Sequence, residues 1–168
     1  DFCFLSHYLT VIVSLTALKT WSNANSNHIP ILTLVEAKED GLANVYPSLS
    51  GFTQPLPFDR DALDAIDADI RSVFGDDLNK VITPDDVRGT NESLEAVTSD
   101  GGRPTIGESR GKVFFGLDNG GAIWDEYVSD DTAREGRVLF TSSDTCTPEA
   151  DFLTLNTQPH STPAHVTQ

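Results

Sequence analysis

The sequence lacks methionine altogether, and only two of its 168 residues are cysteines, Cys3 and Cys146. Two cysteines are too few for the disulfide scaffold of a small secreted domain, and they do not stand at the spacing of zinc ligands. A single bridge between them and two separate buried side chains are both compatible with the sequence. Because no methionine precedes Asp1, we expect this end of the chain to be processed or truncated.

Basic residues are also scarce, since 11 lysines and arginines stand against 26 aspartates and glutamates, for a net charge of −15. Such a surface repels the phosphates of nucleic acids, so nucleic-acid binding is not expected. It also disfavours electrostatic docking to an anionic membrane unless a cation lies between the two. An acidic surface is compatible with secretion or with a calcium-containing medium, but the composition does not select between locations.

The acidic residues do not follow the motif of a calcium-binding loop, in which oxygen ligands alternate around a central glycine. Twelve acidic and four basic residues lie between residues 59 and 100. They include Asp76 next to Asp77 and Asp85 next to Asp86, and adjacent side chains point in different directions on most backbones. We interpret this segment as a solvated acidic face, with a metal cluster as the alternative.

An apolar run at residues 29–35 ends at Glu36 and is followed by Lys38. A continuous run of Ile, Leu and Val between polar residues predicts a strand buried on both faces. Side chains alternate along a strand, so Glu36 and Lys38 share the face of Leu32 and Leu34. In parallel α/β folds, binding and catalytic residues lie at the carboxyl ends of strands. The two charges therefore mark either a functional site or simply the exit of the strand into solvent.

Two later segments repeat this pattern of an apolar run with a polar end. Residues 112–118, KVFFGLD, predict a strand that ends in Asp118, and residues 137–143, RVLFTSS, predict one that ends in small hydroxyl side chains. Strands separated by helical segments indicate a parallel sheet, so we expect the polar ends to converge at one mouth. Residues 159–168 contain no core-forming pattern and are predicted to be a loose tail.

Start and stop signals divide the rest of the chain into further elements. The charge-free stretch at residues 2–18 is compatible with a signal peptide or a membrane helix, but we favour a packed helix at residues 8–21. Residues 41–57 predict a long loop that overhangs the end of the 29–35 strand. The other predicted elements are a helix at 60–74 between Asp59 and Gly75, a strand at 81–82, a helix starting at Pro84, a turn at 119–121 and a helix at 147–155.

Five sequence blocks together are typical of one enzyme family. They are WSNAN (residues 21–25), HIPI (28–31), VEAK (35–38), GESRGKVFFGLDN (107–119) and GRVLFTSS (136–143). Through these blocks the chain resembles the calcium-dependent phosphoinositide-specific phospholipase C family of the secreted microbial type, within the phospholipase-C-like phosphodiesterase superfamily. The similarity runs in register from about Lys19 to Asn156, and the blocks around Glu36 and Asp118 are its most specific parts.

The resemblance implies an α/β fold of the (βα)₈ TIM-barrel type and a secreted, monomeric hydrolase that transiently contacts a membrane containing phosphatidylinositol. In this chemistry the inositol 2-hydroxyl attacks the adjacent phosphorus, diacylglycerol leaves and a cyclic inositol phosphate forms. One histidine acts as base and another as acid, while Ca²⁺ offsets charge on the phosphoryl oxygens. By position, Glu36 corresponds to a calcium ligand and Asp118 to a substrate contact. We infer that Lys38 steadies Glu36 and meets the substrate phosphate.

The catalytic histidines of the family and its remaining calcium ligands have no counterpart in this sequence. His28 precedes its strand and matches a position without a catalytic role. We therefore expect residues 1–158 to form the central part of one barrel, without the first and the closing strands and without activity alone. Two alternatives stay open: a related phosphodiesterase that acts on glycerophosphodiesters or sphingomyelin, and a non-catalytic acidic module derived from the barrel.

Overall fold

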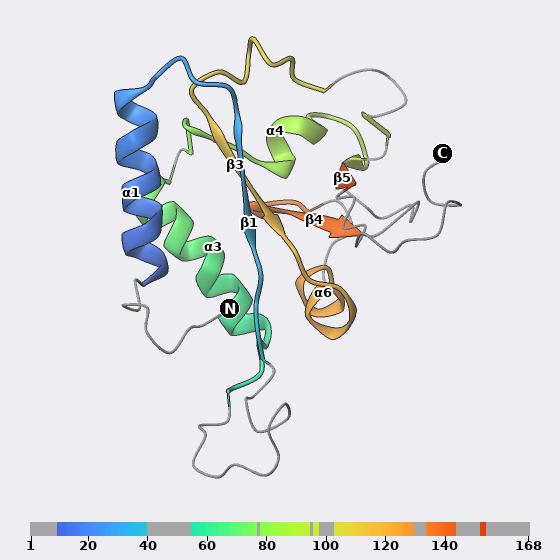
Figure 1. Cartoon of the computed structure of the whole chain (residues 1–168). Helices are drawn as coiled ribbons and strands as arrows, with labels where there is room; N and C mark the ends of the chain where they lie inside the picture. Colours follow the sequence, from blue (N-terminus) through green and yellow to red (C-terminus); the bar gives the residue numbers. More distant parts are fainter. Residues whose placement is uncertain are drawn as a thin grey trace, which may run out of the picture.

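The computed structural model describes residues 10–39, 55–76, 78–94, 96–97, 103–129, 134–143 and 152–153. These residues form an α/β fold in which parallel strands are flanked by helices (Figure 1). The predictions for Cys3, Cys146, residues 41–54 and residues 159–168 lie outside them. The elements in chain order are α1 (Val11–Ala24), β1 (Ile31–Val35), α3 (Arg60–Phe74), β2 (Val81–Ile82), α4 (Pro84–Arg88), β3 (Val113–Leu117), α6 (Gly121–Tyr127), β4 (Leu139–Ser143) and β5 (Phe152–Leu153).

Helix α1 confirms the helix predicted near the start of the chain. The hydroxyl of Thr10 accepts a hydrogen bond from the Val13 N–H, which satisfies one of the unpaired donors of the first turn. Leu15 is buried in the core, and α1 lies beside α3 on one flank of the strands (Figure 1). Within the described part of the chain, no helix has the length and apolar content that crossing a bilayer requires.

Helix α3 begins and ends where the sequence predicts. The Asp59 carboxylate accepts a hydrogen bond from the Ala62 N–H at 3.0 Å, and Gly75 ends the helix with a positive φ of 97°. Its buried residues, Leu63, Asp67, Ile70 and Phe74, recur every three or four positions and so form one face. This face packs against the sheet.

The predicted strand at 81–82 and the helix that follows it both form. Thr83 caps α4 through a capping box, in which its hydroxyl accepts from the Asp86 N–H and the Asp86 carboxylate accepts from the Thr83 N–H. Pro84 occupies the first turn, where its missing N–H costs nothing.

Strand β3 is the centre of the sheet. It pairs in parallel with β1 over its whole length, from Ile31 opposite Val113 to Val35 opposite Leu117. Since β1 takes one edge of β3, the other edge is shared by β2, which pairs with its first residues, and β4, which pairs with its last three. The side chains of Val113, Phe115 and Leu117 are fully buried against the helices, and we call this the outer face. Phe114 points to the opposite, inner face.

Strand β1 is not buried on both faces, which corrects the prediction for this segment. Its inner-face residues Leu32 and Leu34 are 38% and 46% exposed. The physical reason is that the core packs against the outer face of β1, while its inner face is left open by the described residues. An apolar run identifies such a strand, but it does not reveal what covers each face.

The helix predicted at 147–155 is wrong at Phe152 and Leu153. These two residues form β5, which pairs in parallel with β4, Ser142 lying opposite Phe152. The exposed edge of β4 offers backbone partners that the local helix-start signal does not anticipate. Helix α6 is an element that the sequence did not predict. It starts at Gly121, where the sequence indicates only a turn.

Gly111, just before β3, has a φ of +72° and lies against the chain that enters β1. A Cβ atom at this position would stand 2.2 Å from the Ser26 carbonyl oxygen. We expect Gly111→Ala to lower the free energy of unfolding by about 1–3 kcal/mol, because backbone strain and a backbone clash add together. Gly136 is the matched control, since its φ is +71° with no atom within 4 Å of the added Cβ. Urea unfolding that shows equal losses for both alanine variants would contradict the clash.

Candidate functional site

The carboxyl ends of β1 and β3 lie side by side, with helix α6 following β3 (Figure 1). The Asp118 N–H donates to the Val35 carbonyl oxygen at 2.8 Å, which carries the pairing one residue past the end of β3. Leu34 lies opposite Gly116, so Glu36 and Asp118, each two residues farther on, occupy neighbouring positions on the inner face. The backbone register therefore places the two residues that the strand patterns single out at neighbouring positions.

Glu36 and Lys38 form an ion pair, with 2.9 Å between the lysine Nζ and the glutamate Oε1. Their side chains are 49% and 69% exposed, so the pair contributes little to stability. This exposure agrees with the simpler interpretation of the two charges as the exit of the strand into solvent. The functional interpretation requires in addition that Glu36 and Lys38 lie on the same face as Asp118. Strand alternation from the observed register is consistent with this arrangement.

Asn119 joins the two strand ends through its side-chain amide. Its Oδ1 accepts a hydrogen bond from the Ala37 N–H at 2.7 Å, and its Nδ2 donates to the Ala37 carbonyl oxygen at 2.9 Å. Sequence reasoning assigns no role to Asn119, although it ends the most specific block of the sequence. The missing information is the strand register, which places Asn119 opposite Ala37 and which no local pattern contains.

Glu39 ties the same segment to the start of α3. Its Oε2 accepts a hydrogen bond from the Phe58 N–H at 3.1 Å, so the two ends of the long predicted loop come together. Residues 55–57 are irregular and exposed, as the loop prediction requires. The region beyond Glu36 is thus anchored on both sides, by Asn119 and by this bond.

The carboxylates at this mouth fit calcium in kind but not in number. Calcium binds about 6–8 oxygen ligands and favours carboxylates, which Glu36 and Asp118 supply. Among the residues that the structure describes, no group of three or more His, Cys, Asp or Glu side chains could hold a metal. The Lys38 ammonium already stands where a cation would meet Glu36 Oε1. The described residues at the mouth thus supply fewer oxygen ligands than a calcium ion takes.

The other polar residues of interest serve the fold. His28 lies at the opposite end of β1, where its Nε2 is 2.7 Å from Ser22 Oγ. Asp85 pairs with Arg88 within α4, and Asp86 caps the same helix. The acidic segment thus contributes to helix formation here.

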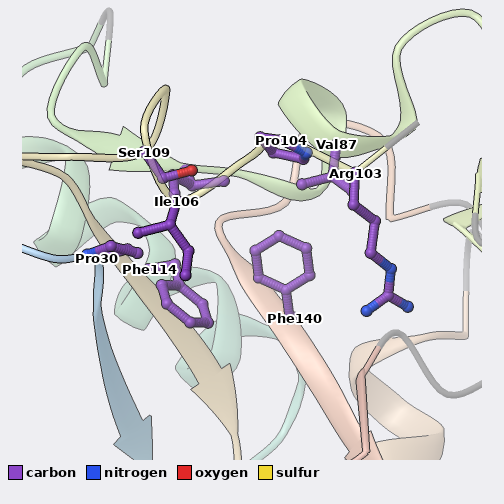
Figure 2. A pocket seen from close by; sticks show the side chains of 9 residues that line it. Pro30, Val87, Arg103, Pro104, Ile106, Ser109, Phe114 and Phe140 are labelled. Atoms are coloured by element: carbon purple, nitrogen blue, oxygen red, sulfur yellow. The ribbon is translucent and has the colours of Figure 1, made fainter. Parts of the chain in front are cut away.

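A pocket of about 210 Å³ opens on the inner face, at the end of the sheet away from Glu36 (Figure 2). Its wall is largely apolar, with the rings of Phe114 and Phe140 meeting edge to face 6.2 Å apart. The side chains of Ile106 and Pro104 close it from the loop before β3, and Arg103 lies at its rim (Figure 2). It contains no acid–base pair and is separate from the carboxylate mouth.

A buried polar cluster lies on the outer side of β4. The Arg137 guanidinium stands 3.2 Å from Asp67 Oδ2 and 4.4 Å above the Tyr127 ring, and the Tyr127 hydroxyl donates to Asp67 at 3.2 Å. Burial raises the pKa of Asp67, and the hydrogen bond from Arg137 offsets part of that effect. Burial likewise raises the pKa of Tyr127, which keeps its hydroxyl protonated. The cluster joins α3, α6 and the start of β4 on the outer face of the sheet.

Comparisons with solved structures show the fold. A calcium-dependent phosphatidylinositol-specific phospholipase C from Streptomyces antibioticus is 22% identical, with a TM-score of 0.58 over 82% of this chain and 43% of that one. A calcium-dependent phospholipase C from a Gram-negative Pseudomonas species, in complex with myo-inositol, is 18% identical, with a TM-score of 0.58 over 84% and 44%. A second crystal form of that enzyme gives 20% identity and a TM-score of 0.56 over the same shares.

The chain thus spans less than half the length of these solved structures. No functionally curated protein sequence matches it. The family model described as "Phosphoinositide phospholipase C, Ca2+-dependent", in contrast, matches residues 1–168, the whole chain. The chain therefore belongs to the calcium-dependent phosphoinositide phospholipase C family.

Proposed function

We propose that this chain is the central part of a phosphoinositide phospholipase C that cleaves phosphatidylinositol to diacylglycerol and a cyclic inositol phosphate. One observation carries the proposal: Glu36 and Asp118 stand at neighbouring positions where two parallel strands end, and Lys38 is beside Glu36. Carboxylates and a cation at the carboxyl ends of barrel strands are suited to a metal and a phosphate ester. The match of the whole chain to the calcium-dependent family supports this assignment.

Each of the three residues has a proposed role. Glu36 is a ligand of calcium, which when bound stabilises negative charge on the phosphoryl oxygens. Lys38 leaves Glu36 to meet the substrate phosphate, and Asp118 accepts a hydrogen bond from a hydroxyl of the head group. The acid and base come from histidines in polypeptide outside this sequence, so we assign no catalytic residue to this chain.

The open inner face supports the proposal of a partial barrel. Leu32 and Leu34 are partly exposed there, and the apolar pocket beside Phe114 and Phe140 opens on the same side. In a closed barrel such side chains fill the interior in layers. We propose that strands from the rest of the protein cover this face, that residues 1–158 belong to one barrel domain, and that the protein acts outside the cell as a monomer.

A lipid-cleavage assay with the complete protein tests this function. Vesicles containing phosphatidylinositol should release diacylglycerol in the presence of CaCl₂ and lose that activity in EGTA. Parallel assays with a glycerophosphodiester and with sphingomyelin separate the proposed substrate from those of related phosphodiesterases. If the complete protein cleaves none of the three substrates, the result would favour a non-catalytic module instead.

Asp118→Ala tests the proposed substrate contact. A hydrogen bond to a charged group is worth about 1.5–3 kcal/mol, so we expect kcat/KM for phosphatidylinositol to fall by about 10- to 100-fold. The melting temperature of the variant shows whether it is folded. An unaltered kcat/KM in the folded variant would remove Asp118 from the site.

A further inference from the structure

We propose that Asn119 is a positioning residue, which holds Ala37 so that Glu36 and Lys38 project together from the inner face. This inference rests on the proposed function, because it concerns the calcium ligand and the phosphate contact of that site. The juxtaposition is specific, since one side-chain amide satisfies both backbone groups of one residue, Ala37.

The amide of Asn119 continues the strand pairing after the backbone has stopped. Val35 lies opposite Leu117, and the next residues, Glu36 and Asp118, remain in step through the bond from the Asp118 N–H to Val35. One step farther, the side chain of Asn119 offers a donor and an acceptor to Ala37, as a paired backbone would. The pairing is thereby extended by two residues beyond β1.

The backbone of β3 is unable to make this pair itself. After Asp118 the chain leaves the sheet for helix α6, with Gly120 as the cap and Gly121 at a φ of +60°. Only a side chain can therefore reach back to Ala37, and among the uncharged side chains an amide combines a donor and an acceptor at its tip.

The contact decides the direction of Glu36. The Ala37 side chain is 6% exposed and belongs to the outer-face core, so its two neighbours must project to the inner face. The 2.9 Å ion pair between Lys38 and Glu36 shows that these two side chains lie on the same side of the segment. If the two hydrogen bonds of the Asn119 amide are lost, the charge of Glu36 is unchanged but its position is held less firmly. A metal ligand that is already held in place loses little conformational freedom when the metal binds. Calcium affinity should therefore depend on Asn119.

Calcium affinity separates positioning from a purely structural role. We expect Asn119→Leu in the complete protein to weaken CaCl₂ binding by about 10- to 100-fold, the range for residues that orient metal ligands. Isothermal titration calorimetry without lipid measures this directly. At limiting calcium the variant should turn over phosphatidylinositol vesicles more slowly than wild type does. At saturating calcium part of this difference should disappear, because high calcium fills the weaker site.

Asn119→Ser and Asn25→Leu complete the design. Serine is small and retains at most one of the two bonds, so its calcium affinity should lie between those of wild type and Asn119→Leu. Wild-type calcium affinity in Asn119→Ser would overturn the inference, whether or not the leucine variant folds. Asn25 is the matched control, since its amide donates to the Trp21 carbonyl at 2.9 Å at the far end of α1. Asn25→Leu should leave calcium affinity unchanged, and a loss equal to that of Asn119→Leu would also overturn it.

Glu36→Gln distinguishes failure of this inference from failure of the proposed function. If wild type binds no calcium, or if Glu36→Gln binds it as tightly as wild type, the proposed function fails and the positioning role with it. If Glu36→Gln weakens binding while both Asn119 variants bind normally, the function stands and the positioning role alone is overturned.

Discussion

Replacement of Glu36 by glutamine in the complete protein is expected to lower the turnover of phosphatidylinositol by at least about 100-fold. The change preserves the shape of the side chain and removes its charge, which a hard divalent cation requires for tight binding. Calcium titrations of the initial rate should show both a lower maximum and a higher calcium requirement. The ion pair with Lys38 is lost as well, but it is solvent-exposed, so the melting temperature should stay close to that of wild type.

Glu39→Gln is the matched control for this experiment. Glu39 is three residues farther along the same segment and carries the same charge, yet its carboxylate accepts from the Phe58 N–H. Glutamine keeps an oxygen that accepts the same hydrogen bond, so removal of the charge at Glu39 should leave the calcium requirement unchanged. If the two variants titrate alike, the effect is one of net charge and Glu36 is not a ligand.

Replacement of Arg137 by methionine is expected to cause the largest loss of stability, about 3–5 kcal/mol in the free energy of unfolding. The Arg137 and Asp67 side chains are 8% and 10% exposed, so the change leaves a buried carboxylate without its ionic partner. Urea unfolding at neutral pH measures the loss. Arg137 also contacts the half-exposed Asp64, at 2.6 Å. Arg60→Met is the control, because Arg60 pairs with the same Asp64 oxygen but not with the buried Asp67, and a loss of at most about 1 kcal/mol is expected.

A second substitution identifies the buried charge as the cause. Adding Asp67→Asn to Arg137→Met removes the charge but keeps an acceptor for the Tyr127 hydroxyl, so part of the stability should return. If the double variant is less stable than Arg137→Met alone, the arginine acts through packing on the Tyr127 ring instead.

The pH dependence of Arg137→Met follows from the raised pKa of Asp67. A carboxyl with a raised pKa in the folded state contributes stability that is complete below its unfolded pKa, about 3.9, and is lost as the pH rises through the folded pKa. Without Arg137 the folded pKa of Asp67 rises further, which enlarges the loss at neutral pH. The deficit of the variant relative to wild type should therefore be smaller at pH 4 than at pH 7, and an equal deficit would contradict this account.

Local patterns predicted the elements that depend on local chemistry. Asp59 and Gly75 delimit α3 because a cap acts within one turn of the helix, and the carboxylate-ended runs give β1 and β3 because strand alternation is local. The same alternation placed Glu36 and Asp118 on one face. Parallel pairing of the two strands then brought them together.

The features that depend on register or on distant partners were not predicted. Leu32 and Leu34 are exposed because the core packs only against the other face of β1, and Phe152 forms a strand because it pairs with β4. Asn119 acquires its role only when it lies opposite Ala37. Arg137 meets Asp67 from 70 residues away, so a basic residue before a strand gave no indication of a buried pair.

A crystal structure of the complete protein with calcium and myo-inositol tests the central claim most directly. We predict calcium at the mouth of the strands, with a Glu36 carboxylate oxygen about 2.3–2.6 Å from the ion and Asp118 within hydrogen-bond distance of an inositol hydroxyl. Calcium bound elsewhere, with Glu36 still paired to Lys38 and Asp118 away from the sugar, would contradict it.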